Sequence, residues 1–108
     1  MAVSFVYLTT GGAEEARHIA RSVVGEGLAA CANLFDGVNS IYEWQGSVQD
    51  GQECIVVLKT AREQFEALRT RIMELHSYDC PCIVELSIER GHAPFLEWVE
   101  AQTRSEQR

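Results

Sequence analysis

The segment from His76 to Cys82, HSYDCPC, holds an imidazole, a phenol, a carboxylate and two thiols. Thiolates and imidazole are the donors that monovalent copper and zinc accept most readily. If the backbone around Pro81 is extended, Cys80 and Cys82 lie on the same side, because side chains of a strand alternate with a period of two. His76, Cys80 and Cys82 are therefore candidate metal ligands, and two thiolates with one imidazole suit monovalent copper at low coordination number.

A purely structural interpretation of the same segment remains open. Cys80 and Cys82 could be half-buried residues at the start of a strand, and His76 could cap the carbonyl groups at the end of a helix. Cysteine is among the most buried residue types, and CxC spacing is a weaker metal signal than paired CxxC motifs. The segment alone does not decide between these interpretations.

A second set of residue types offers a nucleophile, a cation and an acid or base. Catalysis would require the Cys31 thiol to lie within hydrogen-bond reach of His76. The small apolar neighbours of Cys31 in LAACANL favour an inert thiol, so we expect no enzyme. Lys59, near the end of a strand, suits an anion instead. The candidate ligand-binding residues are Cys31, Lys59, Tyr78 and Asp79.

Hydrophobic periodicity predicts that these residues lie on alternating strands and helices. The predicted strands are Val3–Thr9, a long and kinked strand through Trp44, a long strand ending at Thr60 and a strand following Pro81. The predicted helices are Ala13–Gly25, Arg62–His76 with His76 in its last turn, and the segment APFLEWVEAQTR. Gly46 marks the hairpin between the two long strands.

This order is βαββαβ followed by one more helix, which predicts an α+β fold of the ferredoxin-like split-sheet type. A chain of 108 residues forms one domain, residues 1–108. Helices on one side leave the other face of the sheet uncovered, although both faces carry apolar residues. We therefore expect that face to be buried against other subunits of a closed, cyclic oligomer.

The net charge and the composition argue against some classes of binding partner. A net charge of -7 disfavours nucleic acid and anionic membrane surfaces, which need clustered Lys and Arg. No apolar run approaches the roughly 20 residues of a spanning helix, and the start MAVSFVYLTT lacks the basic flank of a signal peptide. The expected location is cytoplasmic, with the four cysteines reduced.

Four segments together resemble the CutA divalent-cation-tolerance family, in order and spacing: GLAACANLFDGVNSIYEWQG, ECIVVLKT, HSYDCPCIVELSI and FLEWV. The resemblance covers nearly the whole chain. It implies a ferredoxin-like subunit, a tight homotrimer with extended hairpins packed between subunits, and a role in tolerance of divalent cations, particularly copper, without a demonstrated reaction. Copper or another divalent cation is the bound ion that it implies.

Residue by residue, the resemblance is partial at HSYDCPC. The family's motif reads His-Pro-Tyr-Glu-x-Pro-Glu, and this chain departs from it at Ser77, Asp79 and Cys82. Where copper ligands are assigned in the family, the corresponding positions here are Thr9, Leu75 and His76, so only His76 carries over. The substitution of Cys82 for the usual glutamate predicts a changed metal preference.

Three aromatic residues also match the family: Tyr42, Trp44 and Trp98. Aromatic side chains on hairpins and helices commonly anchor interfaces, so we assign them to the trimer interface. Ferredoxin-like trimers also resemble PII-type signalling proteins, which leaves an alternative function open. In that alternative the protein is a sensor that binds a small molecule between subunits.

Overall fold

The protein is described here by a computed structural model that covers residues 2–103. Its elements are β1 (Val3–Thr10), α1 (Ala13–Gly25), β2 (Cys31–Trp44), β3 (Ser47–Ala61), a 3-10 turn (Arg62–Gln64), α2 (Phe65–Leu75), β4 (Ile83–Ile88) and α3 (Ala93–Thr103). Every predicted strand and helix is present. Arg104, the last residue of the predicted third helix, lies outside the described residues.

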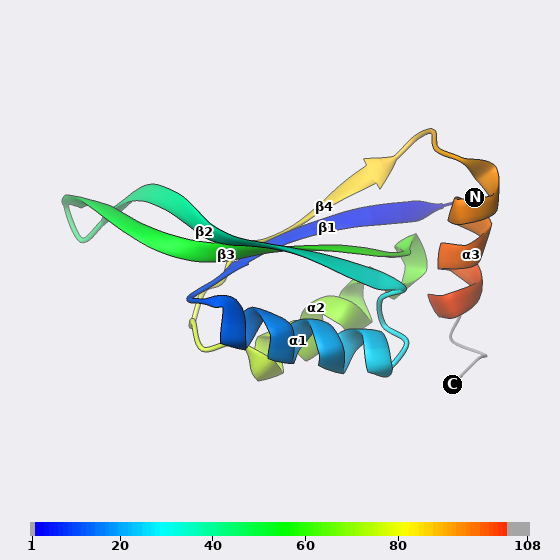
Figure 1. Cartoon of the computed structure of the whole chain (residues 1–108), viewed down its shortest axis with the longest axis horizontal. Helices are drawn as coiled ribbons and strands as arrows, with labels where there is room; N and C mark the ends of the chain where they lie inside the picture. The colour runs from blue at the N-terminus through cyan, green and yellow to red at the C-terminus, as the bar shows by residue number, and fades with distance from the viewer. Residues whose placement is uncertain (1, 104–108) are drawn as a thin grey trace.

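The four strands form one antiparallel sheet in the order β2-β3-β1-β4 (Figure 1). β1 lies in the middle, between β3 and β4, and β2 and β4 form the two edges. The β2–β3 hairpin is much longer than its neighbours and extends beyond them on one side, as Figure 1 shows. The molecule is elongated as a result, with principal extents of 45 × 27 × 21 Å.

α1 and α2 cover one face of the sheet, and the main core lies between them and the strands (Figure 1). Val6 and Leu8 of β1 meet Ile19 of α1 and Ile72 of α2, and all four are fully buried. Burying a side chain of this size stabilises a fold by about 1.5–3 kcal/mol. This core fixes the register of the sheet, because a slip of one residue would turn these side chains to the opposite face.

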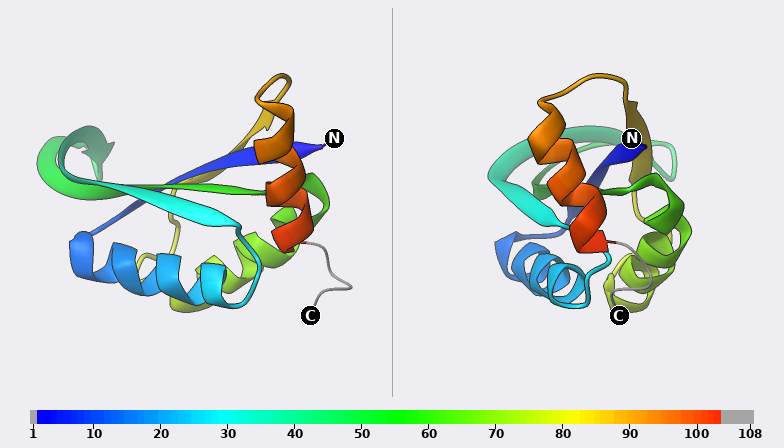
Figure 2. Two further views of the ribbon diagram at one scale, coloured as in Figure 1. Left: turned by 45° about the vertical axis from the view of Figure 1, so that its right-hand side comes forward. Right: turned by 90° about the vertical axis from the view of Figure 1, so that its right-hand side faces the viewer.

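α3 packs on the opposite face, but only over one end of the sheet (Figure 2). There Leu96 and Val99 of α3 contact Val3 and Ala30 in a second, smaller buried cluster. The hydroxyl of Thr103 accepts a hydrogen bond from the backbone N–H of Ala61 at 3.0 Å and so joins the end of α3 to the end of β3. The prediction that the helices lie on one side of the sheet is therefore wrong for α3. Within residues 2–103, no helix covers the rest of this face.

We call this uncovered side of the sheet the open face. The strand register defines it in rows, because directly opposed residues of an antiparallel sheet point to the same side. One row runs across all four strands through Cys31, Lys59, Phe5 and Leu86. The exposed apolar side chains on the open face are Phe35 on β2 and Val84 and Leu86 on β4.

The backbone of the hairpin bends where glycine allows it. A bulge interrupts the pairing of β2 with β3 between Phe35 and Val38, and Gly37 within it has a φ of 68°. At the tip, Gln45 (φ 50°) and Gly46 (φ 83°) both adopt left-handed conformations and form a two-residue turn. The predicted kink and turn are therefore both present.

The predicted helix over Arg62–His76 differs from the structure at both ends. Its first three residues form a 3-10 turn, and α2 ends at Leu75 rather than including His76. The backbone of His76 is extended (φ -80°, ψ 142°), although its N–H still donates to the carbonyl of Ile72 at 2.8 Å. This extended conformation turns the imidazole away from the helix and toward β1.

None of the helices within residues 2–103 combines the length and apolar character needed to cross a membrane.

Candidate functional site

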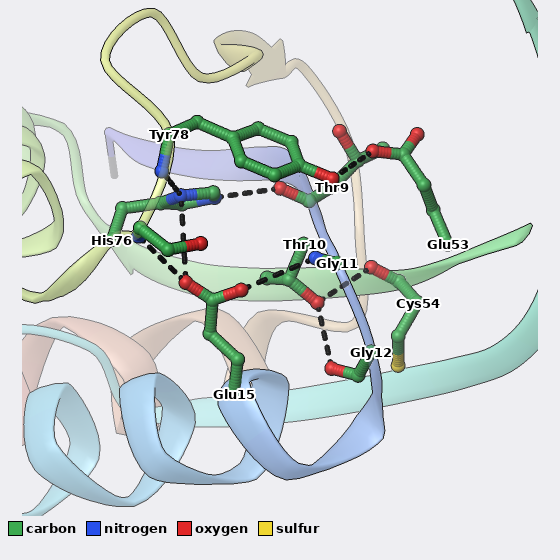
Figure 3. A network of polar contacts seen from close by, with 10 residues as sticks. Thr9, Thr10, Gly11, Gly12, Glu15, Glu53, Cys54, His76 and Tyr78 are labelled. Carbon is green, nitrogen blue, oxygen red and sulfur yellow. Dashed lines mark hydrogen bonds and ion pairs between the residues drawn. The ribbon is translucent and has the colours of Figure 1, made fainter. Parts of the chain in front are cut away.

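His76 directly follows the last residue of α2 (Figure 3). Its side chain is 0% exposed. Its Nδ1 accepts a hydrogen bond from the backbone N–H of Tyr78 at 3.0 Å. The proton of the neutral ring must then reside on Nε2, which donates to the carbonyl oxygen of Thr9 at 2.8 Å. Both ring nitrogens are thus engaged by the backbone, and the tautomer is determined by the fold.

Glu15 joins the first turn of α1 to the same segment. Its Oε2 accepts from the backbone N–H of Ser77 at 2.7 Å, and its Oε1 accepts from Gly11 N–H at 3.2 Å. Oε2 also lies 3.6 Å from Nδ1 of His76. Burial alone would raise the pKa of Glu15, but the hydrogen bonds from Ser77 and Gly11 and the nearby His76 outweigh it, so the pKa is lowered.

Tyr78 extends the cluster to β3. Its ring packs on the ring of His76 with centroids 4.8 Å apart, and its hydroxyl donates to Oε2 of Glu53 at 2.8 Å. The other oxygen of Glu53 accepts from the hydroxyl of Ser40 at 2.7 Å. Burial first, and then the hydrogen bond and charge of Glu53, raise the pKa of Tyr78 to about 12. The phenol therefore stays a donor at neutral pH.

These contacts form what we call the His76 network: Thr9, Glu15, Glu53, His76 and Tyr78 (Figure 3). It ties together β1, α1, β3 and the loop between α2 and β4. Beside it, the hydroxyl of Thr10 lies 3.0 Å from the carbonyl of Gly12 and 3.2 Å from that of Cys54. Every polar side chain in the network has a partner, which is the arrangement expected of a stabilising cluster.

The candidate metal ligands are not assembled within one chain. Cys80 and Cys82 are free and exposed, whereas His76 is buried with both nitrogens occupied. Residues 2–103 contain no group of three or more His, Cys, Asp or Glu side chains placed to hold one ion. Burial and the charge of Glu53 raise the pKa of the Cys82 thiol, which disfavours its thiolate.

The structural interpretation of HSYDCPC also needs correction. The two thiols are exposed rather than half-buried, since they lie in the loop before β4 begins at Ile83. The imidazole of His76 bonds to the carbonyl of Thr9 in β1 and not to carbonyls at the end of its own helix. It therefore connects α2 to the sheet.

The candidate ligand-binding residues occupy separate places in the chain. Cys31 lies directly opposite Lys59 on the open face, and Nζ of Lys59 donates to Oδ1 of Asn33. Tyr78 instead bonds to Glu53 of β3. Glu53 and Lys59 are six residues apart along this strand, which corresponds to about 20 Å at a rise of about 3.3 Å per residue. Asp79 is exposed in the loop. Within residues 2–103 these side chains therefore do not form one site.

Cys31 and His76 are likewise apart. His76 contacts the carbonyl of Thr9, whose partner in the sheet is Ile55, while Cys31 is paired with Lys59. Four residues along β3 separate these rows, which corresponds to about 13 Å. A nucleophile and a base must be within hydrogen-bond reach, so this pair is not formed within one chain.

The aromatic residues assigned to the trimer interface are all exposed. Tyr42 and Trp44 lie on the projecting hairpin with 49% and 61% of their surface exposed. Trp98 on α3 is 43% exposed and contacts the ring of Phe95 with centroids 5.9 Å apart. The interface itself remains a prediction.

Sequence reasoning missed Glu15 and Glu53. An acid in the first turn of a helix is favoured by the helix dipole alone, so Glu15 does not stand out as a partner of a distant loop. Nothing local in QECIVV marks Glu53 as a partner of a residue 25 positions away. The one available signal for Glu15 is its place in the first helical turn, four residues after Gly11, where a long acceptor can fold back to the loop.

Comparison with known proteins gives the family. The model of the family described as CutA1 divalent ion tolerance protein matches residues 4–102. The divalent-cation tolerance protein CutA of Thermus thermophilus is 42% identical over 98 residues, covering 91% of this chain and 95% of that protein. The chain belongs to the CutA1 divalent ion tolerance protein family.

Two further relatives extend the comparison. The chloroplastic protein CutA of Arabidopsis thaliana is 38% identical over 100 residues, which are 93% of this chain and 55% of that protein, so this chain spans about half of its length. The solved structure of the periplasmic divalent cation tolerance protein CutA of Archaeoglobus fulgidus superposes with a TM-score of 0.91 at 35% identity. That superposition covers 94% of this chain and 99% of the other. The similarity is therefore one of sequence and of fold.

Proposed function

We propose that the protein is a homotrimeric, ferredoxin-like metal-ion-binding protein that contributes to tolerance of divalent cations, with copper as the first candidate ion. The family to which the chain belongs supports the link to divalent ions. The element order and the strand order β2-β3-β1-β4 are those expected of a ferredoxin-like subunit. The net charge of -7 favours accumulation of cations at the surface.

The observation that carries a metal-binding role for this chain is the pair of exposed thiols, Cys80 and Cys82, with only Pro81 between them. Their chemistry fits a soft ion such as monovalent copper better than a hard divalent one. His76 fits less well as a ligand, because it must give up its hydrogen bond with Thr9 or Tyr78 to offer a lone pair. We assign the thiols as the primary donors and His76 as a donor that becomes available only if the loop opens.

An anaerobic titration with monovalent copper, and a parallel titration with divalent copper, tests this proposal. The proteins to compare are the wild type, the double variant Cys80→Ser/Cys82→Ser and His76→Ala. Cys31→Ser is the matched control, because it removes a thiol from another part of the chain. We expect the double variant to lose the tight monovalent copper site and the control to keep it. Equal stoichiometry and affinity in all four proteins would contradict the proposal.

A sensor function of the PII type is the second candidate. Lys59 favours it, because its ammonium group lies on the open face, where other subunits of a trimer would pack and form clefts. A thermal-shift screen with nucleotides and dicarboxylates tests it, with Lys59→Met as the variant that should lose any stabilisation. Absence of stabilisation by every compound would count against this candidate.

A cytoplasmic location belongs to the same proposal. The names of the relatives include chloroplastic and periplasmic proteins, so location varies within the family. Fractionation of cells that express the protein without a tag would establish it.

A further inference from the structure

The loop between α2 and β4 carries two thiols that the folded core does not use. Cys80 and Cys82 are both free and exposed, and the loop that holds them belongs to no helix or strand. The other two cysteines differ in position: Cys54 is 0% exposed within the core, and Cys31 is half-buried on the open face. Access to the sulfur atom is one of the conditions that thiol–disulfide exchange requires, and both thiols meet it.

The spacing of Cys80 and Cys82 permits a bond between them. Two residues apart in a fully extended chain, their Cα atoms would be separated by about 6.6 Å, close to the upper end of the 4.4–6.8 Å range of disulfides. Pro81 between them has no N–H, so closing the ring breaks no hydrogen bond of the intervening residue.

Cys31 and Cys54 have no such option. Cys31 faces Lys59 in the sheet, and Cys54 faces Thr10. Cys54 lies in the row next to Ile55, and its side chain points into the core, opposite to the open face that Cys31 occupies. A bond from Cys54 to Cys31 would require the sheet to come apart.

We propose that Cys80 and Cys82 form a reversible dithiol–disulfide site that reacts with low-molecular-weight disulfides such as oxidised glutathione. The first thiolate attacks one sulfur of the small disulfide, forms a mixed disulfide and releases one small thiolate. The second thiolate attacks the protein sulfur of that mixed disulfide, so that the Cys80–Cys82 bond forms and the second small thiol leaves. The two protons of the protein thiols end on the two released thiols, and the small disulfide is the oxidant.

The small ring makes the bond reversible. A disulfide closed over a single intervening residue gains little from restricting the unfolded chain, because that gain grows with loop length. An exposed bond of this kind has an oxidising potential and is reduced readily by small thiols. The site therefore responds to the redox state of its surroundings. This inference does not require metal binding, although the oxidised form would lack the two thiolates that the proposed copper site uses.

Mass spectrometry after exposure to oxidised glutathione tests the inference, with a chelator present so that metal has no part. After unreacted thiols are alkylated, trypsin separates the two pairs, because residues 22–59 carry Cys31 and Cys54 and residues 72–90 carry Cys80 and Cys82. We expect the 72–90 peptide of the wild type to lose the mass of two hydrogen atoms and to escape alkylation. Treatment with dithiothreitol should restore both thiols.

The single variants Cys80→Ser and Cys82→Ser are the controls. Each should retain one glutathione on its remaining thiol, because the second attack is impossible, and the double variant should retain none on this peptide. A wild-type 72–90 peptide that carries glutathione on both thiols, or that stays fully alkylated, would overturn the inference. Because no metal is present, a failed copper titration leaves this result unaffected, and the two proposals are tested separately.

Discussion

At the scale of single residues, His76 connects two elements by hydrogen bonds to backbone atoms on either side of its ring. The backbone N–H of Tyr78 points at Nδ1, and the carboxylate of Glu15 lies 3.6 Å from the same nitrogen. Nε2 bonds to the carbonyl of Thr9. Both ring nitrogens are therefore occupied, and a metal ion would have to displace one of these hydrogen bonds.

Glu15→Gln should lower the free energy of unfolding by about 1–2 kcal/mol near neutral pH. Each carboxylate oxygen of Glu15 accepts from a backbone N–H, of Ser77 or of Gly11, and glutamine would place its NH₂ group against one of these donors. The pKa of Glu15 is lowered in the folded state, so its contribution is present above the ordinary value of 4.5 and is lost as pH falls through the lower folded value. Urea unfolding over a pH series measures this, and the two proteins should converge in acid.

Glu14→Gln is the matched control for that experiment. Glu14 lies in the same first turn of α1, so it has the same helix-end environment, but its side chain is exposed. A pH dependence equal in both variants would show that the macrodipole, rather than the bonds to the loop, gives Glu15 its effect.

Tyr78→Phe removes the hydroxyl that donates to Glu53, and it should destabilise the fold by about 1 kcal/mol below pH 10. The pKa of Tyr78 is raised to about 12, so the bond is fully present below the ordinary value of 10.0 and is lost as pH rises through 12. An alkaline titration that follows phenolate absorbance should show one ionisation step near pH 12 in the wild type that is absent in Tyr78→Phe. If the step that disappears lies near pH 10 instead, the result would contradict the bond between Tyr78 and Glu53.

At the scale of elements, periodicity predicted the strands and helices well because each has one buried side. The helix Ala13–Gly25 was predicted with the bounds it has, since its apolar residues repeat every three to four positions. The end of α2 was misplaced because His76 continues the helical pattern in sequence, while its bond to Thr9 draws its backbone out of the helix. Glu15 and Glu53 could not be predicted for a similar reason, because their partners Ser77 and Tyr78 are distant in the sequence.

The tip of the β2–β3 hairpin gives a prediction at this scale. Gln45 has a φ of 50°, a left-handed conformation that costs a residue with a Cβ about 1–2 kcal/mol and that asparagine tolerates better. Gln45→Asn should slow amide hydrogen exchange in the hairpin. Gly46→Ala should speed it, because Gly46 has a φ of 83°.

Exchange in the core of β1 should be unchanged in both hairpin variants, because the tip lies far from the packed helices. A uniform change over the whole chain would show that the hairpin unfolds together with the core. That result would contradict the local effect expected for a projecting element.

At the scale of the whole molecule, the open face and the projecting hairpin expose large hydrophobic side chains, and contiguous exposed apolar patches mark interaction surfaces. Leu86 is 56% exposed and lies in the row that crosses the whole sheet. We therefore expect Leu86→Glu to convert the proposed trimer to monomers, because it places a carboxylate in an apolar interface.

Val24→Glu is the control, since Val24 is 37% exposed but lies on α1, which covers the other face. Light scattering measures the masses, and circular dichroism verifies that both variants fold. A monomeric wild type at micromolar concentration, or a trimer that survives Leu86→Glu, would show that the open face is not the surface through which subunits associate.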